Sequence, residues 1–514
     1  MKVEKSGSKM NTNQLKLGVY LSYISLFVTN ITNLILTPFI IRNLGQSEYG
    51  LYMLIGAIVG YIAVLDFGLG NTTVRYVSKY KAEKDRRGEE NFLFSTSIIY
   101  ILISFIILII GIVMYLNLEK IFSNSLTLEE IDIAKVMFII LIINLAFTLP
   151  IKLFTGIIKA YEKFAIPNLL TISRVLIRAI ILLVLLTLGY KAIAIVLVDA
   201  ILNFIIMLVS LAYVFLKLKV RIKPYGFDKQ IYKEIFSYSS LIFVSVIVDQ
   251  IYWRIGHLVL GIVASTSEVA IFAISMTFAQ YFISFSTAIS GVFLPRITRL
   301  VIKDATGEEL TDVLIKTGRL QFIVLGFVLG GFIIVGKKFI LLWAGPGFGT
   351  SWMLALIVMI PLIIVLIQTV GISILQAKNM HGFRALSYLF IAILNAIISI
   401  YLAKSFGAIG SAVGTSLSLI FGNIIVMNFY YHFKVKLNIP RFYKEVFNHL
   451  LISWIFSIIL GTILLLLPNN SWTILILQGL VYSVIYLIIM WYYGMNEYEK
   501  KLFKTEFIKF KSRF

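Results

Sequence analysis

Long apolar stretches, each of about twenty residues, alternate along the chain with short polar segments. A stretch of this length spans the hydrocarbon core of a bilayer as an α-helix. Helices are expected throughout, because backbone groups in lipid must bond within their own segment and single apolar runs cannot close a barrel. The pattern predicts about fourteen spans, at residues 17–41, 49–68, 92–117, 134–155, 169–188, 191–216, 236–262, 269–294, 317–336, 352–375, 385–404, 408–431, 448–467 and 473–493.

Composition supports this interpretation, because 59% of the 514 residues are hydrophobic and only 14% are charged. The first apolar segment, 17–41, is too long for the core of a signal peptide, and no small-residue cleavage site follows it. We therefore expect it to remain as the first span of an all-α polytopic membrane protein.

The formal net charge of +21 raises the question of nucleic-acid binding. The basic residues fall on alternate loops, with about 35 of the 46 Lys and Arg on one side and about six on the other. This asymmetry predicts both termini in the cytoplasm and a place in the cell (inner) membrane. The basic loops also suit contact with anionic membrane lipid, and no nucleic-acid partner is expected.

The sequence lacks the residues that disulfide, metal-binding and nucleotide-binding sites require. The chain has no cysteine, and its four histidines (257, 381, 432 and 449) do not have metal-ligand spacing. Neither a Walker-type loop nor a dinucleotide fingerprint occurs. We expect no metal and no cofactor.

Two pairs of segments suggest an internal repeat. Residues 47–58 match 267–278 at an offset of 220, and residues 188–201 match 406–419 at an offset of 218. Duplication of a six-helix unit would give two parallel lobes, although apolar helices also match by chance. The predicted division is an N-terminal lobe (1–216), a cytoplasmic linker (217–235), a C-terminal lobe (236–431), and two extra helices with a basic tail (432–514).

Three arginines, Arg174, Arg178 and Arg254, lie deep inside predicted spans. A cation at mid-depth costs roughly 2.5–3.5 kcal/mol on insertion scales, so a partner or an aqueous cavity is expected. Arg174 and Arg178 are four residues apart and share one helical face, which suits a phosphate-bearing anion. Alternatively, Arg174 reaches the membrane surface and Arg178 pairs with a carboxylate such as Asp199 or Asp249.

The seventh span places Gln250, Arg254 and His257 on one stripe, with Asp249 on the neighbouring face. A histidine beside an arginine and an aspartate can respond to protons. The alternative is that His257 is a packing residue.

Two further stripes of hydroxyls and amides follow single helical faces. One runs through the first span (Ser22, Ser25, Thr29, Thr32, Asn33) and the other through the eighth (Thr277, Gln280, Ser284, Thr287). Such side chains either line a wet cavity that receives sugar hydroxyls or bridge neighbouring helices. Thr29, Asn33 and Gln280 are the candidates for the cavity.

Three segments carry a family resemblance: "NLGQSEYGLYMLIGAIVGYIAVLDFGLGNTTVRYVSKY" (43–80), "GIIKAYEKFAIPNLL" (156–170) and "VASTSEVAIFAISMTF" (263–278). They resemble bacterial polysaccharide-export flippases of the multidrug/oligosaccharidyl-lipid/polysaccharide superfamily, which includes the MATE exporters and lipid II flippases. The resemblance extends over nearly the whole chain. Its motifs are moderately specific for the superfamily and weak for the substrate.

The resemblance implies movement of a polyprenyl-pyrophosphate-linked oligosaccharide to the outer leaflet by alternating access, for surface polysaccharide synthesis. A cationic central cavity would hold the pyrophosphate and sugar, and Arg174, Arg178, Arg254, Gln250, Thr29, Asn33 and Gln280 suit it by character. Coupling to H⁺ or Na⁺ would involve Asp249, His257 or Asp199. Asp66 and Arg75 lie in a recurrent family segment, where an ion pair or helix cap is favoured over substrate contact. We expect a monomer that is not an enzyme, with polysaccharide synthesis proteins as further partners.

Three alternatives remain open on the sequence alone. A cation-coupled multidrug exporter on the same scaffold would need an acidic cavity, and Asp199 and Asp249 could supply its carboxylates. A membrane glycosyltransferase or polymerase would need catalytic groups near the aqueous side, and the short outer loops offer no such cluster. The third alternative is a non-transporting scaffold for a synthesis complex.

Overall fold

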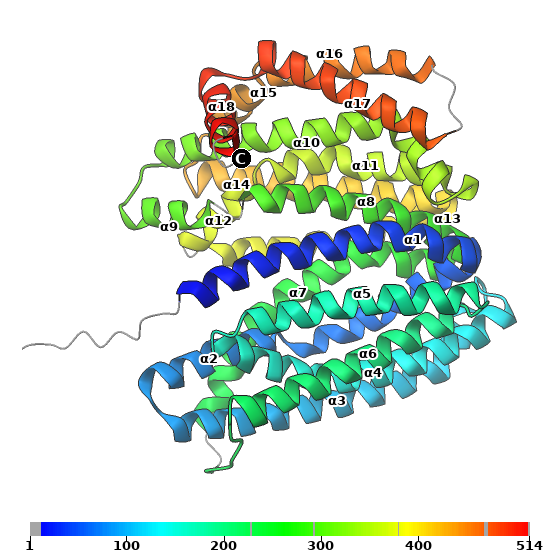
Figure 1. The fold of residues 1–514 in the computed structure, drawn as a ribbon, viewed down its shortest axis with the longest axis vertical. Coiled ribbons are helices and arrows are strands. Elements are labelled where there is room, and N and C mark those ends of the chain that lie inside the picture. The colour runs from blue at the N-terminus through cyan, green and yellow to red at the C-terminus, as the bar shows by residue number, and fades with distance from the viewer. Residues whose placement is uncertain (1–11, 227–228, 291–292, 379, 467–470, 512–514) are drawn as a thin grey trace, which may run out of the picture. The chain divides into compact units, whose positions relative to one another are not determined.

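The structure is a computed structural model that describes residues 12–226, 229–290, 293–378, 380–466 and 471–511. Helices account for nearly all of these residues, and no strand occurs within these ranges (Figure 1). The chain forms two compact units. The first comprises Met1–Gln250 and Ser265–Ser267, and the second Ile251–Ala264 and Glu268–Phe514.

The first unit is built from long helices joined by short turns. Within it α1 packs along α5, and α4 packs between α3 and α6 (Figure 1). Its elements are α1 (Thr12–Ile62), η1 (Ala63–Asp66), α2 (Leu69–Glu83), α3 (Arg86–Phe122), α4 (Leu128–Ala160), α5 (Ala165–Thr187), α6 (Ala192–Ala212), η2 (Tyr213–Lys217) and the first part of α7 (Lys229–Val263).

The second unit has α10 near its centre, in contact with α11, α15, α16 and α17. Its elements are the rest of α7, α8 (Thr266–Ser290), α9 (Leu294–Ile302), α10 (Gly307–Trp343), η3 (Pro346–Phe348), α11 (Gly349–Leu366), α12 (Thr369–Ala377), α13 (His381–Leu419), η4 (Ile420–Val426), α14 (Met427–Phe433), α15 (Ile439–Phe447), α16 (Leu450–Thr462), η5 (Ile463–Leu466), α17 (Trp472–Ile489), η6 (Met490–Gly494) and α18 (Glu497–Lys511).

Several helices begin before the apolar stretch that predicted them. α10 starts at Gly307, ten residues ahead of the predicted span, because Thr306 and Glu309 form a reciprocal capping box. α3 starts at Arg86, where the Asp85 carboxylate accepts a hydrogen bond from the Gly88 backbone N–H at 2.9 Å. Capping therefore extends these helices into polar sequence.

The described residues contain twelve helical segments that are long and apolar enough to cross a membrane. Two of them, Tyr20–Glu83 and Gly382–Phe433, each contain two predicted spans. Glycines with left-handed backbone interrupt both, Gly45 at φ 78° and Gly407 at φ 54°. The all-helical membrane fold is confirmed, and the count of fourteen spans stays a prediction.

Each unit contains a similar contact between its two repeat segments, shifted by two residues in the second segment. In the first unit, the Glu48 carboxylate accepts a hydrogen bond from the Ala192 backbone N–H at 2.9 Å. In the second, the Glu268 carboxylate accepts one from the Ala408 N–H at 2.7 Å. Glu48 and Glu268 are equivalent positions of the first predicted repeat pair, and each binds a helix start in the second pair. The lobe boundaries at 217–235 and 431 remain a prediction.

Candidate functional site

The turn between α5 and α6 sets two polar faces against each other. Gly189, at φ 88°, allows the chain to reverse, and α5 then packs against α6. Arg174 and Arg178 lie one helical turn apart on α5, and Asp199 lies on α6. The structure therefore brings together three of the predicted site residues.

Asp199 binds both arginines. Arg178 forms a two-point pair, with Nε 2.7 Å from Oδ1 and Nη2 3.0 Å from Oδ2 of Asp199. Arg174 makes a single contact, from its Nη2 to Asp199 Oδ1 at 3.1 Å. We call Arg174, Arg178 and Asp199 the arginine triad. Tyr52 of α1 lies beside Arg178 but is not a member of the triad.

The two guanidinium groups differ in what they can still bind. The side chain of Arg178 is 15% exposed and that of Arg174 is 29% exposed. The Arg174 Nε is buried and has no hydrogen-bond partner among the described residues. Arg178 is thus paired with a carboxylate, as the alternative interpretation of the sequence expected. Arg174 keeps an N–H donor that has no partner among the described residues. Two guanidiniums against one carboxylate leave the triad with one positive charge.

The predicted stripe on α7 divides between the two units. Asp249, which is exposed, and Gln250, which is half-buried, belong to the first unit. Arg254, which is half-buried, and His257 belong to the second. Their predicted roles in substrate binding and ion coupling stay predictions.

His257 lies in the packed interior of the second unit. It is 6% exposed, and its ring meets the Phe272 ring edge-on with the ring centres 5.2 Å apart. Its Nδ1 has no hydrogen-bond partner within the described ranges. These contacts are the ones that the packing alternative predicts.

The polar stripes on α1 and α8 are partly used for helix contacts. Asn168 of α5 donates to the Ser22 hydroxyl at 2.9 Å, which ties α1 to α5. On α8, the Thr277 and Ser284 hydroxyls donate to carbonyls of their own helix. The predicted cavity residues are half-buried (Thr29) or exposed (Asn33, Gln280).

Asp66 lies where η1 interrupts the helical path between α1 and α2. Its carboxylate, 13% exposed, pairs with Lys152 of α4, with Oδ2 2.9 Å from Nζ. The Tyr100 hydroxyl of α3 lies beside it. This arrangement matches the structural ion pair that was favoured for Asp66. Arg75 is exposed, with its guanidinium 6.0 Å from the centre of the Tyr76 ring.

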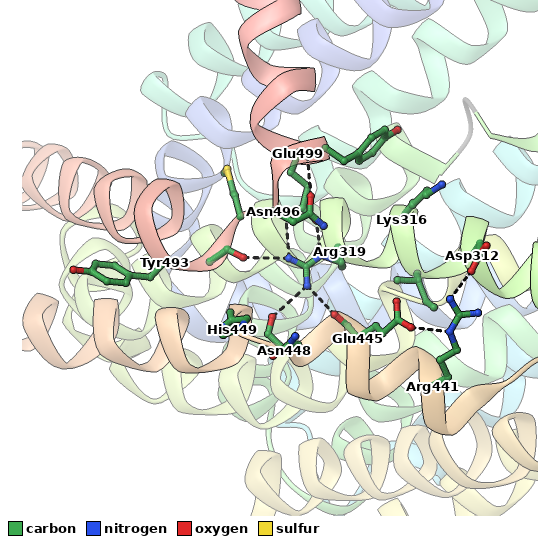
Figure 2. Close-up of a pocket in the computed structure, with 14 residues that line it drawn as sticks. Asp312, Lys316, Arg319, Arg441, Glu445, Asn448, His449, Tyr493, Asn496 and Glu499 are labelled. Atoms are coloured by element: carbon green, nitrogen blue, oxygen red, sulfur yellow. Dashed lines mark hydrogen bonds and ion pairs between the residues drawn. The ribbon is translucent and has the colours of Figure 1, made fainter.

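An arginine that hydropathy did not single out, Arg319 of α10, is 7% exposed in the second unit (Figure 2). Its Nε and Nη2 bind the Glu499 carboxylate at 2.5 and 3.1 Å. The remaining N–H groups donate to three backbone carbonyls, those of Glu445 (2.7 Å), Asn448 (3.2 Å) and Gly494 (3.1 Å). All five donors of the guanidinium are therefore used.

Arg319 fastens the C-terminal helices to α10. Its partners come from α15, the turn before α16, the end of η6 and the start of α18, around a cavity of about 550 Å³ (Figure 2). Carbonyls at helix C-termini carry partial negative charge, which adds to the Glu499 carboxylate. Because no donor is left over, we assign Arg319 a structural role. The sequence pattern did not identify this pair, because Glu499 lies 180 positions away from Arg319.

No group of three or more His, Asp or Glu side chains is placed to hold a metal ion in the part of the chain that the structure describes.

Comparison with known proteins gives a consistent family assignment. Residues 15–301 match the family described as polysaccharide biosynthesis protein. A Haloferax volcanii protein named as a probable low-salt glycan biosynthesis flippase is 25% identical over 413 residues, which cover 79% of this chain and 82% of the relative.

Two solved structures have the same fold. The lipid II flippase MurJ, in its inward closed conformation, superposes with a TM-score of 0.72 at 19% identity, covering 92% of this chain and 98% of MurJ. An inward-facing MATE family multidrug resistance transporter superposes with a TM-score of 0.60 at 14% identity, covering 82% of this chain and 98% of that one.

Proposed function

The chain belongs to the polysaccharide biosynthesis protein family, and we propose that it is a flippase for polyprenyl-pyrophosphate-linked oligosaccharide units. It is a multi-span membrane transporter of the MATE-like fold rather than an enzyme. A relative named as a probable glycan biosynthesis flippase supports a glycan as the cargo. The proposed direction is from the cytoplasmic to the outer leaflet, by alternating access.

The single observation that carries the site assignment is the unequal pairing in the arginine triad. A pyrophosphate brings negative charge into a region where burying an unpaired ion is costly. Arg174 can offer its unpartnered Nε to a phosphate oxygen while Nη2 stays on Asp199. Arg178 holds Asp199 in place through both carboxylate oxygens. Arg174 is therefore the proposed phosphate contact, and Arg178 its support.

The triad also weighs against the cation-coupled drug exporter. That alternative needs a membrane carboxylate that is open to H⁺ or Na⁺, and Asp199 is bound by two guanidiniums. A carboxylate bound by two guanidiniums holds no vacant charge for a drug cation. Asp249 and His257 remain proposed coupling residues, and the coupling ion would be H⁺ or Na⁺.

A substrate comparison in proteoliposomes tests the proposal. Fluorescent polyprenyl-pyrophosphate oligosaccharide, the same molecule carrying a neutral linkage, and a cationic dye are each supplied to vesicles containing the purified full-length protein. Accessibility to an impermeant quencher reports transfer between leaflets. We expect transfer of the pyrophosphate form alone. Transport of the dye without the glycolipid would favour the exporter instead.

A further inference from the structure

At one end of the first unit, several helix ends surround a cavity of about 450 Å³. They are the end of α2, the start of α3, the end of α4 and the stretch that follows η2. We propose that this cavity binds a phosphate group, carried either by a lipid headgroup or by a soluble anion. The five cationic side chains that line it are Lys81, Lys84, Arg86, Lys219 and Arg221. None of them belongs to the arginine triad.

The acidic residues of the cavity are covered and the cationic ones are exposed. Glu89 and Glu90 are 8% and 6% exposed. The Tyr161 hydroxyl donates to Glu89 at 2.8 Å, and the Tyr225 hydroxyl donates to Glu90 at 2.6 Å. Arg86 also binds Glu90 at 3.2 Å. An anion that enters therefore meets ammonium and guanidinium groups, and the two carboxylates are already bound.

One lysine is held in place before any ligand arrives. The Lys81 Nζ lies 4.0 Å from the centre of the Tyr161 ring, a cation–π contact that fixes the ammonium group. Burial, together with the hydrogen bond to Glu89, raises the pKa of the Tyr161 hydroxyl, so this hydroxyl stays protonated and keeps its position. A side chain that is already ordered loses less entropy when it binds a ligand.

The backbone at the cavity has an unusual conformation in two places. Lys84 (φ 58°) and Lys219 (φ 52°) both adopt the left-handed region, which non-glycine residues rarely use. At Lys84 the turn is fixed by a backbone hydrogen bond to the Lys81 carbonyl at 3.2 Å. Lys84 is the C-terminal cap of α2, where a left-handed residue commonly ends a helix, and this turn leads into α3 at the cavity.

Phosphate is the ligand class that these groups fit. Several lysines supply point charges, and Arg221 supplies a planar pair of donors that matches two phosphate oxygens. Basic pockets between membrane helices on the cytoplasmic side bind anionic headgroups. The basic loops predict that this end of the unit faces the cytoplasm. Phosphate binding in this cavity is independent of the transported substrate.

Two binding measurements separate the two sources of phosphate. Isothermal titration of the detergent-solubilised full-length protein with inorganic pyrophosphate tests a soluble anion. Native mass spectrometry after incorporation into nanodiscs tests retention of phosphatidylglycerol over phosphatidylcholine. The variants are the double substitutions Lys81→Gln with Lys219→Gln, and Lys84→Gln with Arg221→Gln. The matched control, Lys303→Gln with Lys434→Gln, removes the same charge at exposed positions of the second unit.

We expect wild type to bind in at least one arm. Each cavity variant should weaken that binding about tenfold or more, and the control less than about twofold, because each variant removes two charge-assisted contacts. Either pair alone is sufficient if the other fails to fold. The measurement in which binding is seen, with pyrophosphate or with phosphatidylglycerol, identifies the source of the phosphate. Equal weakening in cavity and control variants, or no binding by wild type in either arm, would overturn the proposal.

Discussion

Arg174 and Arg178 have the same chemistry and lie on the same face of α5, but they have different surroundings. Arg178 gives both sides of its fork to Asp199, whereas Arg174 gives one nitrogen and keeps a buried Nε without a partner in the described chain. The first geometry stabilises a helix pair. The second is suited to an anion that binds and leaves.

Substitutions in the triad should therefore separate stability from binding. Asp199→Asn leaves two guanidiniums without their carboxylate, and Arg178→Ala leaves Asp199 with only the single contact from Arg174. Each change should lower the free energy of unfolding by about 3 kcal/mol. Arg174→Ala should cost much less, because Asp199 keeps its two-point partner. Equilibrium unfolding in mixed detergent micelles measures the relative stabilities of the three variants. Equal destabilisation by all three would contradict the division of roles.

At Arg319 the requirement is for geometry as well as charge. Lysine supplies three donors and no planar fork, so it cannot reach all the acceptors that surround the guanidinium. We expect both Arg319→Lys and Arg319→Ala to lower the free energy of unfolding by about 3–5 kcal/mol.

The control for this prediction is Arg441→Ala. Arg441 binds three carboxylates, those of Glu308, Asp312 and Glu445, but its side chain is 35% exposed. Water can replace these exposed contacts, so the change in stability should be small. If the two sites responded alike, burial would not be the cause.

At the level of helices, glycine decides where a continuous helical path bends. Gly407 has φ 54°, and a Cβ there would lie 2.9 Å from Glu268 Oε2, the atom that binds the Ala408 N–H. Gly45 has φ 78°, but a Cβ there would have no neighbour within 4 Å. One position combines backbone strain with a steric clash, and the other has strain alone.

Alanine substitutions should rank these positions. Gly407→Ala should destabilise most. Gly45→Ala should cost about 1–3 kcal/mol, because its backbone (φ 78°, ψ 174°) suits glycine alone. Gly56→Ala should be neutral or stabilising. Gly56 lies in helix with nothing within 4 Å of the added Cβ. Thermal unfolding of the three variants in detergent tests the ranking. A Gly56→Ala variant as unstable as Gly407→Ala would refute it.

For the molecule as a whole, apolar periodicity was sufficient for the membrane class and most helix positions. It was insufficient for helix starts such as Gly307 and Arg86, because polar capping residues determine these. The pairing of Arg178 with Asp199 was foreseen as an alternative, since both residues lie in adjacent spans. Arg319 with Glu499, and the cationic cavity lined by Lys81 and Lys219, were missed. They join residues far apart in sequence, and hydropathy carries no such information.

Arg174 is the proposed contact for the phosphate of a transported glycolipid. The most direct measurement is the initial rate of leaflet-to-leaflet transfer of polyprenyl-pyrophosphate oligosaccharide in proteoliposomes, for Arg174→Ala, wild type and the control Arg299→Ala at an exposed position of α9. We predict about a tenfold or greater loss for Arg174→Ala, since one charge-assisted contact is removed, and an unchanged rate for Arg299→Ala. Wild-type transfer by a folded Arg174→Ala protein would contradict the account.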